Sequence, residues 1–567
     1  MVNKRQPLSL RELAMGRVCQ QLESTSQQLQ HLAAKTSIDA TLRYTQHTLR
    51  PYWAYALPAV LRTEIMERTI GKLAQTHMNC GQLVSGPITL YILNLCLAPD
   101  IKTLKISLCC YYGCSNQSLL FKCLLVEGAG LEKLELVRSS LLRYEARLFR
   151  AAIGTMNNLK SLTLRNIAND TILDIVGTAC RRLTYLDISS SKAVTDKGVQ
   201  KMLFGIEIRA GMERQTESTW SKMKGLLKRI RKKQKYIELR DERKDLILDY
   251  IENTNPVCET LRVINIHQTS ITPAGALNIL IHAQHIESLG GYALMGRVAE
   301  IIHKRIVILR QPFNLKHLKC NKLTMGRAML ISQLCPKLEK LHISEPIEVP
   351  LDTNLFTQLT YLRLENIACD EGWTNKFYDY ISANGKRLLH VSLHCEGVAH
   401  EFDLRLIFKY CPNLRTFSRV GHIGTVVWND EADGTMPMLK DLDSIRLGES
   451  ITRKAIINLM RHAPSLRVCH LGECGGFDES DLTTLLQGQN ALTNTIECFY
   501  LYSGVCINAC HTMNMFNMCQ KLKRIGNPSG WGLAQKDVEL LNDFMKKRNI
   551  KVYFGDDRHW YDRKCMS

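Results

Sequence analysis

A short pattern of apolar residues recurs along most of this chain, and no other feature constrains its fold as strongly. The clearest copies read "CRRLTYLDI" from Cys180, "CETLRVINI" from Cys258 and "CPKLEKLHI" from Cys335. Copies without the cysteine include "NNLKSLTL", "GLEKLEL", "PDIKTLKI", "FTQLTYLRL" and "KRLLHVSL". The last two apolar residues of each copy alternate, so they lie on the same side of a short strand.

The copies are regularly spaced. Their first apolar residues lie at positions 101, 131, 159, 183, 261, 286, 315, 338, 359, 388, 414, 439, 466, 496 and 522. Apart from the gap between 183 and 261, neighbours differ by 21 residues (338 to 359) to 30 residues (466 to 496). Segments between the expected strands, such as "RKAIINLMRHA" at 453–463, have helical periodicity. One copy cannot bury its apolar side alone, so the copies must stack.

This pattern resembles leucine-rich repeats of the cysteine-containing class over roughly residues 90–550. The resemblance implies an α/β fold, namely a leucine-rich-repeat solenoid of about 15 repeats with a short all-helical N-terminal region. The class is common in substrate receptors of ubiquitin ligases. The cysteines that recur at one repeat position are predicted to be small buried residues rather than reactive ones; they are Cys180, Cys258, Cys335, Cys411 and Cys519.

Composition bears on location and partners. The chain has 567 residues, a formal net charge of +20 and 21 cysteines. It shows neither the apolar core of a signal peptide nor a run of 18 apolar residues, so we expect no membrane span. Reduced thiols and a cytoplasmic and/or nuclear location follow. The positive charge is compatible with an anionic partner, nucleic acid or acidic protein, or with a dispersed basic surface.

The sequence shows no motif of an enzyme or a metal site. It lacks a phosphate-binding Gly-x-x-x-x-Gly-Lys loop, a His-Glu-x-x-His zinc motif, a Gly-x-Ser-x-Gly nucleophile elbow and a kinase signature. There is no Cys-x-x-Cys pair, and "CCYYGC" and "CINACH" are too isolated for a zinc site. We therefore expect a non-catalytic protein with no catalytic residues, no metal and no cofactor.

An isolated amphipathic helix is predicted near the start of the chain, in "SLRELAMGRVCQQL" from Ser9. Ser9 is a plausible N-cap with Glu12 three residues later. The residues predicted to share its apolar face are Leu10, Leu13, Ala14, Val18 and Leu22. About 70 residues separate this segment from the repeats, so its apolar face is expected to need another partner.

The segment resembles an Elongin BC box, a motif that reads Ser/Thr/Pro-Leu-x-x-x-Cys/Ser/Ala-x-x-x-aliphatic. Ser9, Leu10, Ala14 and Val18 fill its four places, with alanine where cysteine is commonest. The resemblance implies Elongin B and Elongin C as partners, with Elongin C contacting these four residues and Leu13.

A second element resembles the Cullin-2 box. In "LPAVLRTEI", Leu57, Pro58, Leu61 and Ile65 match aliphatic-Pro-x-x-aliphatic-x-x-x-aliphatic. Pro58 suits the first turn of a helix, and Leu61 and Ile65 then share one face. The order of the two boxes and the repeats resembles the zyg-type and PRAME-type receptors of Elongin BC–Cullin-2 ubiquitin ligases, although an armadillo-like C-terminal part is not evident. The resemblance implies Cullin-2 as a partner.

Two alternatives explain the same N-terminal segment. The helices could simply cap the end of the repeat stack, which needs a polar terminal element. The Leu-Pro start is also typical of an F-box, but only about 30 residues separate Leu57 from "TLYILNL", which we interpret as the first strand. The chain could therefore also be an F-box-type protein or an interaction scaffold without a link to a ligase.

Residues that flank the inward pair of each strand are expected on the concave side of the solenoid. Tyrosine and arginine are favoured anchors of binding interfaces. The candidates for contact with a protein substrate are His267, Tyr292, His317, His342, Tyr361, Arg363, His390, His394, His470, Tyr500 and Tyr502. An ordinary polar strand surface is the alternative interpretation.

The break in the repeat spacing contains a basic run in "KMKGLLKRIRKKQKY". Its densest part is Lys228, Arg229, Arg231, Lys232 and Lys233. Such a run is typical of a nuclear localisation signal, a nucleic-acid patch or a solvated helix on a tolerated insertion. We expect a helical insertion here.

Together these patterns predict a substrate-recognition subunit of a cullin-RING ubiquitin ligase, in the ubiquitin-conjugation pathway. The predicted parts are a helical adaptor-binding region at 1–85 with the two boxes at 9–18 and 57–65, repeats at 86–200, a basic helical insertion at 201–257, repeats at 258–550 and a tail at 551–567.

Overall fold

The computed structural model shows a mixed α/β chain that divides into two compact units. The N-terminal unit comprises residues 8–292 and 301–315, and the C-terminal unit comprises residues 293–300 and 316 onward. The structure describes residues 9–80, 86–108, 114–138, 146–205, 254–305, 311–345, 355–368, 370–396, 401–421, 424–429, 437–503 and 505–555. The basic run at 228–233, most of the predicted insertion and the end of the tail lie outside these residues.

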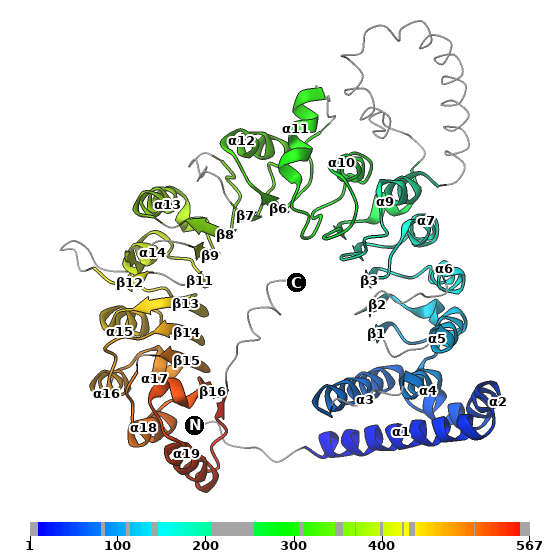
Figure 1. Ribbon diagram of the computed structural model, residues 1–567, viewed down its shortest axis with the longest axis horizontal. Coiled ribbons are helices and arrows are strands. Elements are labelled where there is room, and N and C mark those ends of the chain that lie inside the picture. The colour runs from blue at the N-terminus through cyan, green and yellow to red at the C-terminus, as the bar shows by residue number, and fades with distance from the viewer. Residues whose placement is uncertain are drawn as a thin grey trace, which may run out of the picture. The chain divides into compact units, whose positions relative to one another are not determined.

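Helices alone make up the first part of the N-terminal unit, as predicted (Figure 1). They are α1 (Leu10–Lys35), α2 (Ile38–Tyr44), the π-helical turns η1 (Thr45–Leu49) and η2 (Pro51–Tyr55), α3 (Ala59–Cys80) and α4 (Gly86–Cys96). The segment "TLYILNL" lies in α4, so its interpretation as a first strand is wrong. Its apolar residues are nearly all buried among the other helices, which favours the helix despite its strand-like sequence.

Strands and helices then alternate in the same unit. The strands are β1 (Thr103–Leu108), β2 (Lys133–Arg138), β3 (Ser161–Arg165), β4 (Tyr185–Asp187) and β5 (Val263–Asn265). The helices are α5 (Cys114–Glu127), the short η3 (Gly128–Gly130), α6 (Ala146–Thr155), α7 (Asp170–Ala179), α9 (Val257–Thr260) and α10 (Pro273–His282), with α11 (Met295–Arg305) shared between the units. The five strands pair in parallel in sequence order.

The C-terminal unit continues the alternation with a twelve-stranded parallel sheet among the described residues. Its strands are β6 (His317–Asn321), β7 (Lys340–Ser344), β8 (Tyr361–Ala368), β9 (His390–Glu396), β10 (Glu401–Asp403), β11 (Thr416–Val420), β12 (Thr425–Val427), β13 (Ser444–Ile451), β14 (Val468–Glu473), β15 (Cys498–Ser503), β16 (Arg524–Ile525) and β17 (Tyr553–Phe554). The helices are α12 (Met325–Leu334), α13 (Glu371–Asn384), η5 (Gly385–Arg387), α14 (Leu404–Tyr410), α15 (Arg453–His462), α16 (Glu479–Gln487), α17 (Ala491–Asn494), α18 (Ala509–Met518), η6 (Pro528–Trp531) and α19 (Gln535–Lys547).

The repeat pattern locates the strands well. Each of the fifteen predicted positions except 286 is followed within a few residues by a strand that pairs with its neighbours. At 286 the chain makes only an isolated parallel bridge, from Ser288 to Val263. The segment "RKAIINLMRHA" forms α15, as its periodicity predicts.

The core lies between the strands and the helices of each unit. Leu186 and Ile188 in the N-terminal unit and Leu341 and Ile343 in the C-terminal unit are all fully buried, which confirms their prediction. The five recurring cysteines are buried too. Burial raises the pKa of each of their thiols to about 12, so they stay protonated and unreactive at neutral pH.

One cysteine departs from the expectation of reduced thiols. Cys395 in β9 is disulfide-bonded, whereas fourteen other described cysteines are free. Among the described residues, no helix combines the length and apolarity that crossing a bilayer requires.

Helix caps connect neighbouring repeats of the N-terminal unit. The carboxylate of Asp170 accepts hydrogen bonds from the backbone N–H (2.8 Å) and the hydroxyl (2.7 Å) of Thr195. Asp196 binds Thr272 in the same way, at 2.8 Å and 2.6 Å. In each case the polar groups at the start of one helix bind an aspartate side chain of the preceding repeat. The bonds therefore favour one stacking register.

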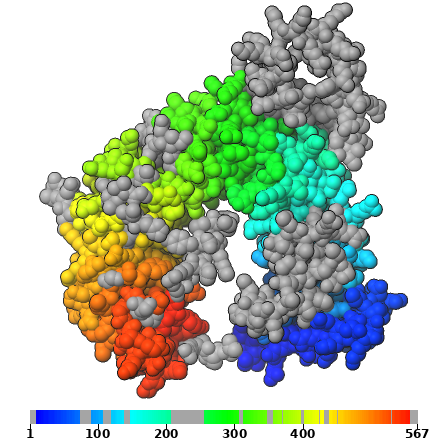
Figure 2. Space-filling view, in the orientation of Figure 1, coloured from blue at the N-terminus to red at the C-terminus, as the bar shows by residue number. Residues whose placement is uncertain are grey.

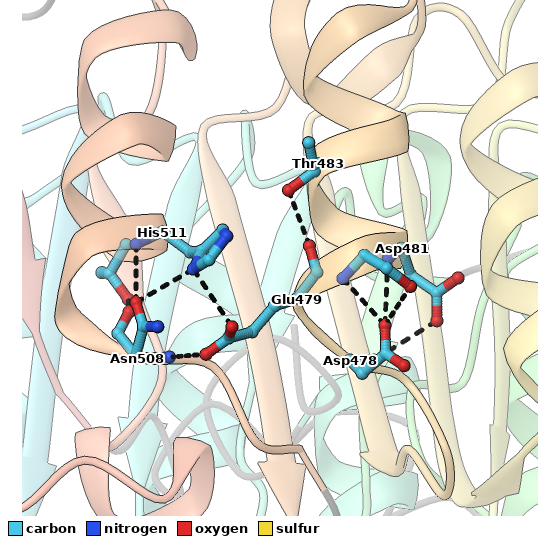
Figure 3. Close-up of polar contacts among 8 residues, drawn as sticks. Asp478, Glu479, Asp481, Thr483, Asn508 and His511 are labelled. Carbon is cyan, nitrogen blue, oxygen red and sulfur yellow. Dashed lines mark hydrogen bonds and ion pairs between the residues drawn. The ribbon is translucent and has the colours of Figure 1, made fainter.

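The same device occurs near the end of the chain (Figure 3). Asp478 caps α16 by accepting from the backbone N–H of Asp481 at 3.1 Å. The adjacent Glu479 extends to the next repeat, where it accepts from the backbone N–H of Asn508 (3.0 Å) and lies 3.4 Å from Nδ1 of His511. Caps therefore join repeats in both units.

Two buried arginines attach the N-terminal helices to the first repeat. Arg50 pairs with Glu127 (Nη1 to Oε1, 2.6 Å) and donates to the carbonyl of Leu97 (2.6 Å). Arg62 donates to the carbonyl of Cys96 at 3.3 Å. Both carbonyls lie at the end of α4, where no helical partner remains for them. The helices and the following repeats consequently form one body, shown blue and cyan in Figure 2.

Candidate partner-binding surfaces

Helix α1 has one buried face and one exposed face. Met15, Cys19 and Leu22 are buried against the neighbouring helices. Leu10 and Leu13, by contrast, are 85% and 51% exposed. Ala14 is also exposed, and Val18 is half-buried. The residues that match the Elongin BC box thus lie on the outer face, whereas Leu22 belongs to the core rather than to the predicted face.

The exposed end of α1 is held in place by α3. Arg11 pairs with Glu64 at 2.6 Å, and Arg68 contacts both Glu64 (2.8 Å) and Glu12 (3.2 Å). Glu12 is therefore occupied by Arg68. Ser9 caps the helix as predicted, because its hydroxyl accepts from the backbone N–H of Glu12 at 3.1 Å. The exposed apolar residues therefore lie on a helix whose position is fixed by these contacts.

The four residues that match the Cullin-2 box are divided between surface and core. Pro58 is exposed and directly precedes α3, and Leu57 and Leu61 are half-buried. Ile65 is only 2% exposed, and its carbonyl lies 3.8 Å from the sulfur of Cys19. The expectation that Ile65 contacts a cullin is corrected here: its side chain fills the contact between α1 and α3.

Exposed apolar residues that the motif comparison missed lie close to Pro58 in sequence. Tyr52 and Tyr55 in η2 and Val60 in the first turn of α3 are all strongly exposed. The aromatic residues of "PYWAY" were the available signal, because large apolar side chains without an expected core role are candidates for contact.

The strands of the C-terminal unit align their outward residues in two rows, which we call the strip. The first row is His317, Lys340, Tyr361, His390, Thr416, Ser444, Val468, Cys498 and Arg524. The second row is Lys319, His342, Arg363, Ser392, Ser418, Arg446, His470 and Tyr500. The residues between the rows, such as Leu341 and Phe417, are buried, so the strip faces away from the core.

The register brings seven of the eleven predicted substrate contacts into the strip. They are His317, His342, Tyr361, Arg363, His390, His470 and Tyr500. His394 and Tyr502 lie further along β9 and β15 and are exposed. The remaining two lie in the N-terminal unit: His267 is half-buried with Nδ1 2.9 Å from the carbonyl of Gly291, and Tyr292 is buried.

His470 and Tyr500 are in the strip but are not available to a partner, which corrects the prediction for both. Their rings stack with centroids 4.4 Å apart and an angle of 9°. Nδ1 of His470 also lies 3.0 Å from the hydroxyl of Tyr502. Each of the stacked rings is about 2% exposed, and burial lowers the pKa of His470 to about 3, so it is neutral. Tyr502 presents the exposed edge of this stack.

A compact ionic cluster surrounds Glu365, just beyond the strip. Its carboxylate pairs with Nη2 of Arg363 (2.6 Å) and with Nε2 of His342 (2.8 Å), and it accepts from the hydroxyl of Ser344 (3.1 Å). Burial alone would raise the pKa of Glu365, but the hydrogen bond and charge from His342 and the charges of Arg363 and Lys319 hold it well below its usual range. Glu365 is therefore ionised and fully engaged.

Two lysines and two further arginines complete the strip, and our choice of histidines, tyrosines and Arg363 missed them. They are Lys319, Lys340, Arg446 and Arg524. Reading both outward positions of every repeat in register would have found them. In all, five of the seventeen strip residues are lysine or arginine, four are histidine and none is acidic.

The equivalent rows of the N-terminal sheet are balanced in charge. They read Thr103, Lys133, Ser161, Tyr185, Val263 and Lys105, Glu135, Thr163, Asp187, Asn265. Lys105 pairs with Glu135 at 2.8 Å, and the buried Asp187 pairs with Nε of Arg165 at 2.7 Å. Among the described residues, no cluster of histidine, cysteine or acidic side chains could hold a metal ion.

No protein-family model matches this chain, and no curated protein sequence matches it. Among solved structures, a leucine-rich-repeat protein of Leptospira interrogans is 12% identical, with a TM-score of 0.35 over 82% of this chain and 91% of that one. The complex of Rad7 and Elc1 from yeast matches at 15% identity, with a TM-score of 0.37 over 88% of this chain and 94% of that one. Neither likeness is close enough to assign a function.

Proposed function

We propose that this protein is a non-catalytic substrate receptor of a cullin-RING ubiquitin ligase, acting in the cytoplasm or nucleus. In this proposal α1 binds Elongin C, the segment from Tyr52 to Leu61 contacts Cullin-2, and the strand faces hold a protein substrate. The β–α units of both sheets are taken as about 15 leucine-rich repeats. The solenoid then acts as a scaffold that has no chemistry of its own.

One observation carries the proposal: the apolar residues of the box-like motif are exposed on a helix that the neighbouring helix α3 holds in place. Leu10 and Leu13 leave apolar surface in water that burial against a partner would remove. Ala14 lies between them and the half-buried Val18, and its small side chain permits close approach of another helix. Ion pairs to α3 hold this end of α1, so a partner would not have to order it first.

A second role of the same helices is to cap the first repeat, and the contacts of Arg50 and Arg62 favour it. The two roles use opposite faces of the helical region. Capping explains why Met15, Cys19 and Leu22 are buried, but it leaves Leu10 and Leu13 unexplained.

The test is capture of the full-length chain by immobilised Elongin B–Elongin C. Leu13→Ser should weaken binding at least about tenfold, because burying a leucine side chain contributes roughly 1.5–3 kcal/mol. Leu10→Ala with Ala14→Phe should abolish capture, because it removes one apolar contact and blocks close approach. Leu540→Ser is the matched control, since Leu540 in α19 is also 51% exposed.

If Elongin B–Elongin C captures the Leu13→Ser variant as well as the wild type, α1 is only a cap. An equal loss of capture in Leu540→Ser would lead to the same conclusion. A companion variant, Leu57→Ser with Pro58→Ser, should lose Cullin-2 from the assembly while Elongin capture is retained. Loss of both partners there would indicate misfolding of α3, which the thermal melting curve reports independently.

A further inference from the structure

The residue just before the strand recurs at one position of successive repeats and forms a row along each unit, which we call the ladder. In the N-terminal unit the ladder is Lys102, Glu132, Lys160, Thr184, Arg262 and Glu287, and in the C-terminal unit it is Lys316, Glu339, Thr360, Leu389, Arg415, Asp443, Arg467, Glu497 and Lys523. Within each unit the carbonyl of one ladder residue accepts a hydrogen bond from the backbone N–H of the next, at 2.6–2.9 Å. Ladder residues of neighbouring repeats therefore lie side by side.

The charges of the ladder alternate in sign. Eight neighbouring pairs within the two units consist of two charged residues, and in all eight one residue is basic and the other is acidic. Ion pairs of 2.6–3.8 Å join six of the eight. Glu132, for example, lies 3.8 Å from Nζ of Lys102 and 2.7 Å from Nζ of Lys160. The hydrogen bond from Lys160 is the main reason that the pKa of Glu132 lies below its usual range, so this acid is ionised at neutral pH.

The core by itself would accept a wrong neighbour. Leu134, Leu162 and Leu186 occupy one register position on three successive strands, and all three are fully buried. Stacking that skips one repeat would therefore still bury leucine against leucine at this position. Misassembly of this kind is a characteristic failure of repeat proteins, because their repeats resemble one another. A second signal is needed to distinguish the correct neighbour from the one beyond it.

The ladder distinguishes the two arrangements by charge. Five pairs of charged ladder residues lie two repeats apart within one unit, and in all five the two charges have the same sign. Lys102 and Lys160 form one such pair, and Asp443 and Glu497 form another. Skipping one repeat would place such a pair on neighbouring strands, about 4.8 Å apart, where like charges repel each other. The correct order places opposite charges there instead.

We propose that the alternating charges of the ladder act as a register code, which directs each repeat to its correct neighbours and disfavours stacking that skips a repeat. The inference concerns the assembly of the repeats, so it does not depend on the receptor function. Each exposed ion pair adds little to stability by itself. The ladder acts through the contrast between attraction in the correct order and repulsion in the wrong one, which is a form of selection against alternative structures.

The test changes charges at the start of the ladder, where the uncharged Thr184 separates Lys102, Glu132 and Lys160 from the charges that follow. Glu132→Lys places three cations on neighbouring positions. Hydrogen exchange of the backbone amides of β1, β2 and β3 in the full-length chain, followed by mass spectrometry, should become about tenfold faster at low salt, because two attractions become two repulsions. At about 1 M salt the Debye length is about 3 Å, so the acceleration should fall below about threefold.

Restoring the alternation with opposite signs separates the code from the particular residues. The triple variant Lys102→Glu, Glu132→Lys and Lys160→Glu alternates again, so its amides should exchange within about twofold of the wild-type rates. Glu67→Lys is the matched control, because it makes the same change of charge at an exposed position of α3 outside the ladder. It should leave the exchange of β1, β2 and β3 unchanged. Glu132→Gln removes both pairs without creating repulsion and should give an intermediate rate.

Two results would overturn the proposal. Equal exchange in Glu132→Lys and Glu67→Lys would show that the repeats respond to net charge alone. Exchange in the triple variant as fast as in Glu132→Lys would show that the particular side chains matter and their alternation does not. If circular dichroism shows that Glu132→Lys does not fold, the triple variant still decides, because it carries the same substitution and is expected to fold like the wild type.

Discussion

The two parallel sheets of this protein bury the same kinds of residue on their inner faces and differ in the face they turn outward. Leu162 and Leu186 in the N-terminal sheet hold the same register as Ile264, and Leu341 and Leu362 pair in the same manner in the C-terminal sheet. On the outer face, the N-terminal rows contain two lysines and two acids, whereas the strip contains five cations and no acid. The inner position must fill a fixed volume, whereas an exposed outer position need only be polar, so charge can vary at the exposed outer positions with little cost to the fold.

One inner position of the C-terminal sheet departs from this rule. Arg419 lies in register with Leu393 and Leu447, yet it is almost fully buried. Its guanidinium lies 4.3 Å from the centre of the Phe402 ring, and burial lowers its pKa to about 10. The cation is accommodated by an aromatic face, which shows that the inner row tolerates a charge only with a specific partner.

The largest expected effect compares the cores of the two units. Leu186→Ala and Leu341→Ala each delete a fully buried side chain and leave a cavity, so each should lower the free energy of unfolding by roughly 2–5 kcal/mol. Chemical denaturation of the two variants measures both values. A cost below about 1 kcal/mol in one of them would mean that its sheet is loosely packed, and the cores would not be equivalent.

A smaller effect tests the acids of the N-terminal sheet. Asp187 is buried and accepts from Nε of Arg165 and from the backbone N–H of Ser189 (3.0 Å). Asp187→Asn weakens both bonds and removes the charge, and should cost about 1.5–3 kcal/mol. Lys105→Gln is the surface control and should cost under about 0.5 kcal/mol. Unchanged stability in Asp187→Asn would show that the acid serves only to balance the charge of the face.

The smallest effect concerns acid sensitivity of the C-terminal sheet. The pKa of Glu365 is lower in the folded protein than in the unfolded chain, where it is about 4.3. Its stabilisation is therefore present above that value and is lost as the pH falls through the folded-state pKa. Thermal melting from neutral to acidic pH should show a larger loss of stability for the wild type than for Glu365→Gln. The difference in the free energy of unfolding should be about 1 kcal/mol.

The control for that measurement is Glu345→Gln, which makes the same change at an exposed position just after β7. Its acid profile should follow the wild type. Identical profiles for all three proteins would mean that the cluster around Glu365 adds nothing to stability.

Much of the fold could be predicted because the same short apolar pattern recurs many times along the chain. The positions of nearly all strands, the burial of Leu186 and Leu341 and the burial of the recurring cysteines follow from an alternating pattern within nine residues. The segment "TLYILNL" resisted the same rule, because its apolar residues suit a strand as well as a buried helix. Only its packing among α1, α3 and α5 decides for α4.

The surfaces were less predictable than the core. The outer face of α1 could be predicted in part, but helical periodicity placed Leu22 with Leu10 although the structure buries one and exposes the other. The sequence predicted the histidines, the aromatic residues and Arg363 of the strip, because each of these residues is a candidate for binding by itself. Its lysines and other arginines are evident only as a set, and the set exists only when strands about 25 residues apart in sequence come into register.

The sequence by itself determined that this chain alternates strands and helices, which residues of each repeat turn inward, and where an apolar helix precedes the repeats. These properties depend on neighbours within a turn or a strand, so local spacing suffices. The tertiary structure alone decided that Ile65, His470 and Tyr500 are buried, that Leu10 and Leu13 are exposed, and that the outward lysines and arginines of successive strands come into register in two rows. Burial and electrostatic potential depend on residues from distant parts of the chain, and only folding brings those together.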